Sequence, residues 1–144
     1  MAKLESSITI NRPIEEVFAF VSDMNNSAKY QSGIIEAKMT SDGPVRVGTT
    51  YRYVSQIIGQ KMETNGEVTA YGPPTTWSWK ATKSPFPLQG GMMLEAVEGG
   101  TKVNNWVEAE PGGFFKLAEG LLMKQVQGQT DGDLKKLKEV LEAH

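Results

Sequence analysis

The C-terminal stretch from Phe114 to Ala143 carries its apolar residues at helical spacing. Seven of them project within one broad arc of a helix: Phe115, Leu122, Met123, Val126, Leu134, Leu137 and Leu141. In the first half of the stretch a second side, which includes Leu121, is apolar as well. The pattern therefore predicts one helix of ~45 Å that begins enclosed on several sides and ends with a single buried stripe.

Two glycines within this stretch, Gly128 and Gly132, weigh against one continuous helix. Each costs roughly 1 kcal/mol relative to alanine in a helix interior. A break over Thr130–Asp133, with Asp131 or Asp133 capping a second segment, is the alternative. The apolar spacing passes through both glycines without a change of phase, so we expect the helix to continue.

The N-terminal third of the chain predicts a strand followed by one or two short helices. Leu4–Ile10 alternates between apolar and polar positions, as a half-buried strand does. Pro13 suits the first position of a helix. The buried stripe of this helix is expected at Ile14, Val17, Phe18 and Val21. A second short helix is expected around Ala28–Tyr30.

From Ile34 to Glu110 the apolar period changes to two, which is typical of strands. In the first of these strands we expect Ile35, Ala37 and Met39 to share the buried face. Further strands are predicted over Thr49–Ile58, Lys61–Tyr71, Thr75–Thr82, Leu88–Val97 and Thr101–Glu110. Short turns containing glycine join most of them, so neighbouring strands should pair antiparallel.

This order of elements indicates an α+β domain that spans residues 1–144. A curved antiparallel sheet of about seven strands should wrap around the long C-terminal helix, because long twisted strands with one apolar face curl. A curved sheet around a single helix tends to leave a space between the two layers, and that space is the candidate site.

Composition narrows the function classes. The 144 residues carry a formal charge of −2, with no cysteine and one histidine, the terminal His144. The chain has no excess of basic residues that would favour binding to nucleic acid. It also has no apolar run long enough to insert into a membrane. Disulfides, thiol nucleophiles, a serine–histidine triad and a multi-histidine metal site are excluded. Because its start lacks an apolar leader, the chain is expected to be cytoplasmic. It is also expected to need no cofactor or metal.

Several short phrases resemble one known family across nearly the whole chain. They occur in order, at Ile10–Phe18 with Ser22–Asp23, Val47–Thr49, Gly66–Pro74, Gly99–Val103 and Leu134–Lys138. Together with the element order, they resemble the helix-grip fold of the START-like or SRPBCC superfamily, in its polyketide cyclase/dehydrase and lipid-transport branch.

The resemblance implies an apolar cavity between sheet and helix that holds a lipid, a polyketide-like compound or another small hydrophobic molecule. Some relatives are cyclases, dehydratases or hydrolases, and many only bind their ligand. Two positions depart from the usual pattern: Thr130 interrupts the leucines of the helix, and Asn105 occupies an apolar position of the last strand.

The residues expected to line this cavity are mainly aromatic side chains and methionines on one face of the strands, with apolar residues of the helix. They are Tyr30, Tyr53, Ser55, Ile57, Met62, Trp77, Trp79, Met92, Leu94, Phe115, Leu122, Met123 and Val126. Each of these types also commonly packs a solid core, and the pattern leaves that alternative open.

Three residues could carry chemistry. Glu119 could act as a general acid or base in a dry cavity, with Tyr51, or alternatively Tyr53, as a proton donor and Asn105 as an anchor for a carbonyl. In the alternative, Glu119 reaches solvent where the helix emerges. A bulge at Asn104–Asn105 would likewise turn Asn105 outward and bring Trp106 in.

Three functional hypotheses follow. The first is binding or transport of a small hydrophobic ligand, and the second is a cofactor-independent enzyme of the cyclase or dehydratase kind. The third is a protein-interaction module or homodimer that docks through the apolar loop Ser84–Leu88 and the helix side that bears Leu121.

Overall fold

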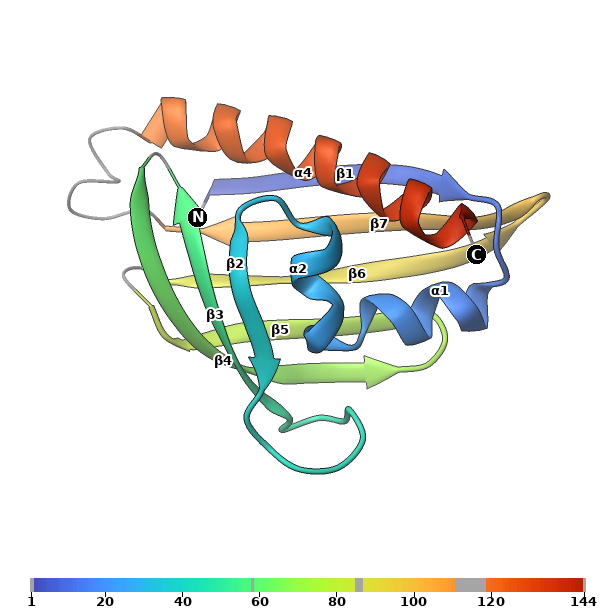
Figure 1. Ribbon diagram of the computed structural model, residues 1–144, viewed down its shortest axis with the longest axis horizontal. Coiled ribbons are helices and arrows are strands. Elements are labelled where there is room, and N and C mark those ends of the chain that lie inside the picture. The colour runs from blue at the N-terminus through green and yellow to red at the C-terminus, as the bar shows by residue number, and fades with distance from the viewer. Residues whose placement is uncertain (1, 58, 85–86, 111–118, 144) are drawn as a thin grey trace.

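The computed structural model describes residues 2–57, 59–84, 87–110 and 119–143. Its strands are β1 (Ala2–Ile10), β2 (Ile34–Met39), β3 (Thr50–Ile57), β4 (Gln60–Gly72), β5 (Thr76–Lys83), β6 (Leu88–Val97) and β7 (Gly100–Ala109). They form one antiparallel sheet in the order β1-β7-β6-β5-β4-β3-β2 (Figure 1). Consecutive strands from β2 to β7 are neighbours, and β1 completes the edge beside β7.

Three short helical segments carry the chain from β1 across to β2. They are α1 (Ile14–Val21), the 3-10 helix η1 (Met24–Asn26) and α2 (Ser27–Tyr30). Pro13 is the N-cap residue of α1, with extended backbone angles, and not its first helical residue. The segments lie over the concave face of the sheet, beside the long helix α4 (Glu119–Glu142) (Figure 1).

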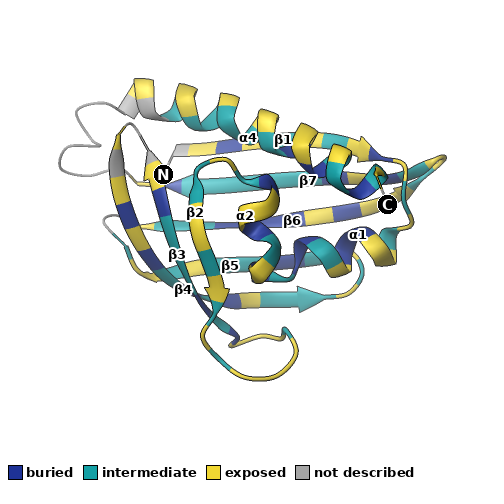
Figure 2. Ribbon diagram, viewed as in Figure 1, coloured by how far each residue is buried: buried dark blue, intermediate teal, exposed yellow. Residues whose placement is uncertain are grey.

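Helix α4 is continuous through Gly128 and Gly132, so the break considered at Thr130–Asp133 does not occur. Its burial differs from the expectation. Leu121 is 60% exposed, whereas Leu134, Leu137 and Leu141 are buried (Figure 2). The prediction that the helix begins enclosed on a second side is wrong at Leu121. The residues before Glu119 lie outside the described part of the chain.

Leu134, Leu137 and Leu141 are buried because α4 packs against both β1 and α2. Glu142 accepts a hydrogen bond from the backbone N–H of Asn11 at 2.8 Å, where β1 has just ended. Its carbonyl oxygen accepts a second from the Arg12 guanidinium at 3.0 Å. These bonds seat the last turns of the helix over the core.

A bulge in β2 overturns one expectation about the strand faces. Ile34 pairs with Ser55 and Glu36 with Val54, so Ile35 is an extra residue opposite the step between them. An extra residue reverses the alternation of the strand. Ile35 is therefore 51% exposed, and the prediction that it shares the buried face is wrong.

A second register shift changes the end of β4. Val68 pairs with Trp79 and Ala70 with Ser78, so Thr69 is the extra residue. The shift turns Tyr71 inward, where its ring packs on Phe18 at a centroid distance of 5.5 Å. The sequence pattern had placed Ala70 on this face instead. Bulges increase local twist, which helps the sheet curl around the helices.

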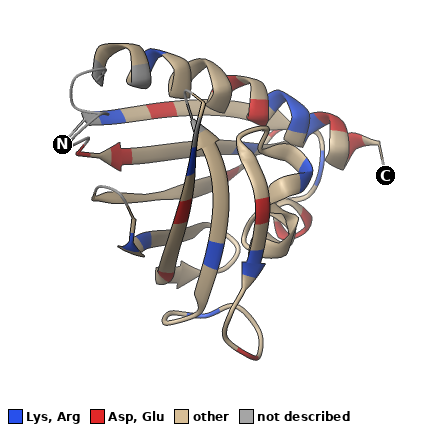
Figure 3. Cartoon of the chain, turned by 60° about the vertical axis from the view of Figure 1, so that its left-hand side comes forward, with Lys and Arg blue, Asp and Glu red and all other residues tan. Residues whose placement is uncertain are grey.

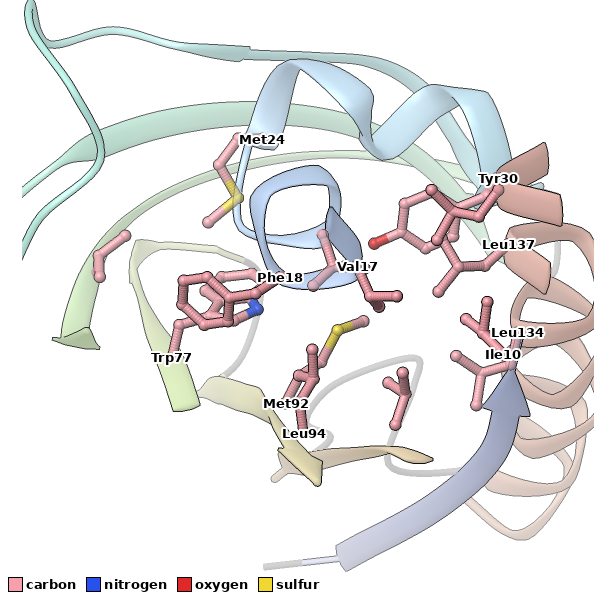
Figure 4. Close-up of a cluster of buried hydrophobic side chains, with 14 of the residues drawn as sticks. Ile10, Val17, Phe18, Met24, Tyr30, Trp77, Met92, Leu94, Leu134 and Leu137 are labelled. Atoms are coloured by element: carbon pink, nitrogen blue, oxygen red, sulfur yellow. The ribbon is translucent and has the colours of Figure 1, made fainter. Parts of the chain in front are cut away.

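The solid core occupies one end of the concave face. Side chains of α1, η1 and the C-terminal half of α4 meet those of the sheet there (Figure 4). Its members include Ile10, Val17, Phe18, Met24, Leu94, Val103 and Leu137. The short helices lie over this end of the sheet, and the first half of α4 extends beyond them (Figure 1).

Candidate functional site

A cavity of about 180 Å³ lies between the middle of α4, from Val126 to Leu134, and the strands β3 to β7. Four residues belong both to its lining and to the solid core and so form the wall between the two: Tyr30, Trp77, Met92 and Leu134. The structure therefore has a packed end and a hollow end, and the hollow end is the candidate site.

The structure brings most of the sequence-suggested residues together in this lining. Those present are Tyr30, Tyr53, Ser55, Met62, Trp77, Trp79, Met92, Asn105 and Val126. Leu94 is instead buried in the core, and Met123 is half-buried away from the lining. Phe115 lies outside the described residues, as do the side chains of Ile57, Glu119 and Leu122.

The sequence analysis did not propose the remaining lining residues as part of the cavity. They are Gln31, Gly33, Ile34, Thr64, Leu88, Val107, Gln129, Thr130, Asp133 and Leu134. Thr64 shares its strand face with Met62, a period-two signal that could have found it. Asp133 follows Gln129 and Val126 at helical spacing. Its neighbours in the cavity, however, come from strands far away in the sequence, so the sequence does not show that they meet. Ile34 was missed because of the bulge that follows it.

Tyr51 is 1% exposed and lies behind the lining rather than in it. Its ring packs on Tyr53 at a centroid distance of 4.8 Å and meets Trp79 edge-on at 6.4 Å. Its hydroxyl has no hydrogen-bond partner among the described residues. Burial, with Tyr53 and Glu67 nearby, raises the pKa of Tyr51 well above its usual range, so the phenol stays protonated.

Tyr53 presents its ring to the cavity while its hydroxyl is held elsewhere. The hydroxyl donates to the Met24 sulfur at 2.8 Å and lies 3.3 Å from the Ser27 hydroxyl. Burial raises the pKa of Tyr53, and the Ser27 hydrogen bond opposes that shift. These contacts orient the ring, so Tyr53 offers the cavity an apolar wall more than a free phenol.

Asn105 retains the inward parity of β7. It pairs with Ser6 on one side and Met92 on the other, and neither ladder shifts register there. The alternative bulge is absent. Trp106 accordingly faces the outer surface, with the Lys3 ammonium 5.9 Å from its ring centroid. Asn105 thus places an amide, which both donates and accepts hydrogen bonds, in the cavity wall.

The mouth of the cavity lies between α2 and α4. Tyr30, Gln31, Gln129 and Asp133 line both the cavity and a shallow outer hollow that also includes Gly128 and Gly132. The amide of Gln129 lies over Gly33, where a Cβ would approach its nitrogen to 2.5 Å. The absence of a side chain at residue 33 therefore makes room for Gln129 at this mouth.

The carboxylate at the mouth, Asp133, is half-buried. Its Oδ1 accepts hydrogen bonds from the backbone N–H and the hydroxyl of Ser32, both at 2.9 Å. Desolvation raises the pKa of Asp133, and the two Ser32 bonds partly offset this. Burial also raises the pKa of Tyr30 to about 12, with Gln31 opposing and Asp133 adding to the shift.

Acidic and basic residues are interspersed along α4 and over the strands (Figure 3). No helix in the described part of the chain is long and apolar enough to cross a bilayer. Within those same residues, no group of three histidine, cysteine or acidic side chains is placed to hold a metal ion. The chemistry that the lining offers is apolar contact, aromatic faces and a few neutral hydrogen-bonding groups, with one carboxylate at the mouth.

A curved antiparallel sheet that grips a C-terminal helix around a hollow defines the helix-grip class of proteins. The chain belongs to the polyketide cyclase/dehydrase and lipid transport family, whose model matches residues 1–142. No curated protein matches the chain.

Solved structures share this fold at low sequence identity. A protein of Thermus thermophilus is 20% identical with a TM-score of 0.85, and the match covers 99% of each chain. The Zhui aromatase/cyclase of a Streptomyces species is 12% identical with a TM-score of 0.78, over 98% of this chain and 93% of that one. A protein of Deinococcus radiodurans is 15% identical with a TM-score of 0.74, over 99% and 98%.

Proposed function

We propose that this protein binds a small, predominantly hydrophobic molecule in the cavity between α4 and the sheet. The observation that carries the proposal is the hollow end of the concave face, whose wall is mostly apolar and aromatic. Ligand sites of this kind combine such walls with a few placed polar groups. Asn105, Thr64 and Ser55 are among the polar groups of the sheet side here.

The size of the cavity suggests a compact ligand. Its volume is about 180 Å³. Apolar protein cavities of roughly 150 Å³ stay dry and bind benzene, so this one suits a molecule with one or two rings or a short alkyl body. Transport would follow from binding if the ligand enters and leaves through the mouth at Gln129 and Asp133.

Naphthol, a compact aromatic alcohol, is a suitable first probe. Its binding should change the tryptophan emission, because Trp77 and Trp79 line the cavity. Trp79→Phe should reduce this response. Trp106→Phe should preserve it, since Trp106 lies on the outer face beside Lys3.

A matched pair on α4 tests whether the cavity itself holds the probe. Val126 lines the cavity and Val140 does not, although both are half-buried on the same helix. Val126→Phe should fill the site and abolish binding, while Val140→Phe should bind as the unmodified protein does. Equal binding by both variants, or no binding of any apolar probe to the unmodified protein, would refute the proposal.

A second candidate function is proton-transfer catalysis of the cyclase or dehydratase kind. One observation favours it: Asp133 and Tyr30 line the same cavity, and desolvation raises the pKa of both. No hydrogen bond joins these two described side chains, which is why we place binding first. Glu119, whose side chain lies outside the description, stays a predicted acid or base.

The two carboxylates can be separated by experiment. Dehydration of an aromatic β-hydroxy ketone to its enone, followed by absorbance, provides an assay that needs no cofactor. Glu119→Gln and Asp133→Asn should each be compared with the unmodified protein, and loss of turnover in one variant would identify the base. Turnover unchanged in both would remove both residues from such a mechanism.

A further inference from the structure

Among the described residues that line the cavity, Asp133 is the only one with a charged side chain. It contributes one carboxylate to a wall that is otherwise apolar, aromatic or neutral. Both of its hydrogen bonds from Ser32 go to Oδ1. Its Oδ2 has no hydrogen bond or ion pair with another described residue, so Asp133 retains the capacity to bind a further donor.

No ion pair joins this carboxylate to a lysine among the described residues. Lys29 and Lys136 line the shallow outer hollow with Asp133, but neither reaches the cavity lining. The ammonium of Lys29 donates to Asn26 at 2.8 Å and lies 5.9 Å from the ring centroid of Phe20. The groups that shift the pKa of Asp133 are its own burial and Ser32, with no lysine among them.

We propose that the preferred ligand is a compact apolar amine, with its apolar body against Trp79 and Met62 and its ammonium group at the carboxylate of Asp133. This inference rests on the proposed binding function and names the chemical class of the ligand. An ammonium group would stabilise this partly desolvated carboxylate, which has no cationic partner among the described residues, by donating a charge-assisted hydrogen bond to it.

The surrounding wall suits the same ligand. Tyr30 and Tyr53 line the cavity with Trp79, and aromatic ring faces attract ammonium groups. A fatty-acid anion would meet the opposite situation, because its carboxylate would face Asp133 with no described cation in the lining. The cavity chemistry thus separates amines from acids of equal size.

Three probes that share one aromatic body test this selectivity: phenethylamine, phenethyl alcohol and phenylacetate. Isothermal titration calorimetry at neutral pH should give an affinity for the amine about tenfold higher than for the alcohol, as a charge-assisted hydrogen bond provides. Phenylacetate should bind most weakly. Equal affinities, or tightest binding of phenylacetate, would overturn the proposal.

Asp133→Asn is the decisive variant, because an amide oxygen can still accept both hydrogen bonds from Ser32. It should remove most of the advantage of the amine over the alcohol, because the ammonium group loses its charged partner whereas a hydroxyl can still hydrogen-bond to the amide. Asp131→Asn makes the same change of charge at an exposed position of α4 outside the lining, and it should retain the preference. An undiminished preference in Asp133→Asn, or equal weakening of all three probes, would contradict a charge-specific role.

Naphthol separates this inference from the function on which it rests. If naphthol binds but the amine gains nothing over the alcohol, the amine proposal fails and the binding function stands. If neither naphthol nor any of the three probes binds, both fail.

Discussion

The phenol of Tyr51 lies directly over Gly66, and a Cβ at residue 66 would overlap its oxygen and ring carbon. These residues face one another across the β3–β4 ladder, where they are register partners. A glycine at this point of the sheet therefore makes room for a buried aromatic ring. Tyr51 and Gly66 shape the wall behind Tyr53 and Trp79 without touching the cavity.

Removing the Tyr51 hydroxyl should stabilise the protein. The hydroxyl is buried and has no partner among the described residues, a situation that costs about 1–3 kcal/mol. Tyr51→Phe should raise the free energy of unfolding by about 1 kcal/mol and leave naphthol binding unchanged. Urea unfolding measures the first effect. A clear loss of stability would mean that the hydroxyl has a partner in solution.

Adding a methyl group at residue 66 should have the opposite effect. Gly66→Ala forces the Tyr51 ring from its place, and such overpacking costs about 1–3 kcal/mol. Gly120→Ala is the control for an added methyl group, because a Cβ there meets open space; it should gain up to about 1 kcal/mol of stability, as alanine is favoured over glycine in a helix. Equal stability of the two variants in urea would show that the ring can shift without cost.

The bulge in β2 predicts unequal effects at two adjacent isoleucines. Ile34 lines the cavity, whereas Ile35 is 51% exposed. Ile34→Thr should weaken naphthol binding and lower stability by about 1 kcal/mol, while Ile35→Thr should stay within about 0.5 kcal/mol. Both substitutions keep a β-branched side chain, so strand propensity is matched. The reverse ranking would place Ile35 inside and refute the bulge.

If ligands enter between α2 and α4, a substitution at Gly33 should change the rates of ligand binding and release. A Cβ there would lie 2.5 Å from the amide nitrogen of Gln129, which must move. Because glutamine is flexible, Gly33→Ala should leave unfolding nearly unchanged while altering the association and dissociation rates of naphthol several-fold. Stopped-flow tryptophan fluorescence measures both rates. Rates identical to those of the unmodified protein and of Gly120→Ala would argue for another entrance.

Glu142 should make the seating of α4 sensitive to acid. The N–H of Asn11 and the ammonium of Lys138 hold the pKa of Glu142 below its ordinary value of 4.5. The ionised form is favoured in the folded state, so this contribution is present above about pH 4.5 and is lost as the pH falls through the lowered folded pKa.

Glu142→Gln should therefore be less stable than the unmodified protein at neutral pH, and the difference should close in acid. Urea midpoints across this pH range measure the gap. Glu139→Gln, at an exposed position on the same turn, controls for net charge. A gap that is constant with pH would show that the carboxylate charge contributes nothing.

The sequence by itself determined the element order, the antiparallel hairpins and the inward faces of most strands, because these depend on local spacing and turn residues. It also determined that α4 continues through Gly128 and Gly132, since the apolar period is unbroken there. The inward parity of Asn105 follows from the same local alternation.

Only the tertiary structure decided which apolar face stays hollow and which groups meet across it. The bulges at Ile35 and Thr69 reverse which side chains face inward along β2 and β4. They arise from pairing with neighbouring strands, which the sequence of one strand does not reveal. Asp133 reaches the cavity mouth because the end of α4 is seated on β1 and α2, elements more than a hundred residues earlier. Long-range packing also buries Leu134, Leu137 and Leu141 of α4 while Leu121 stays exposed, and it leaves a cavity beneath the middle of the helix.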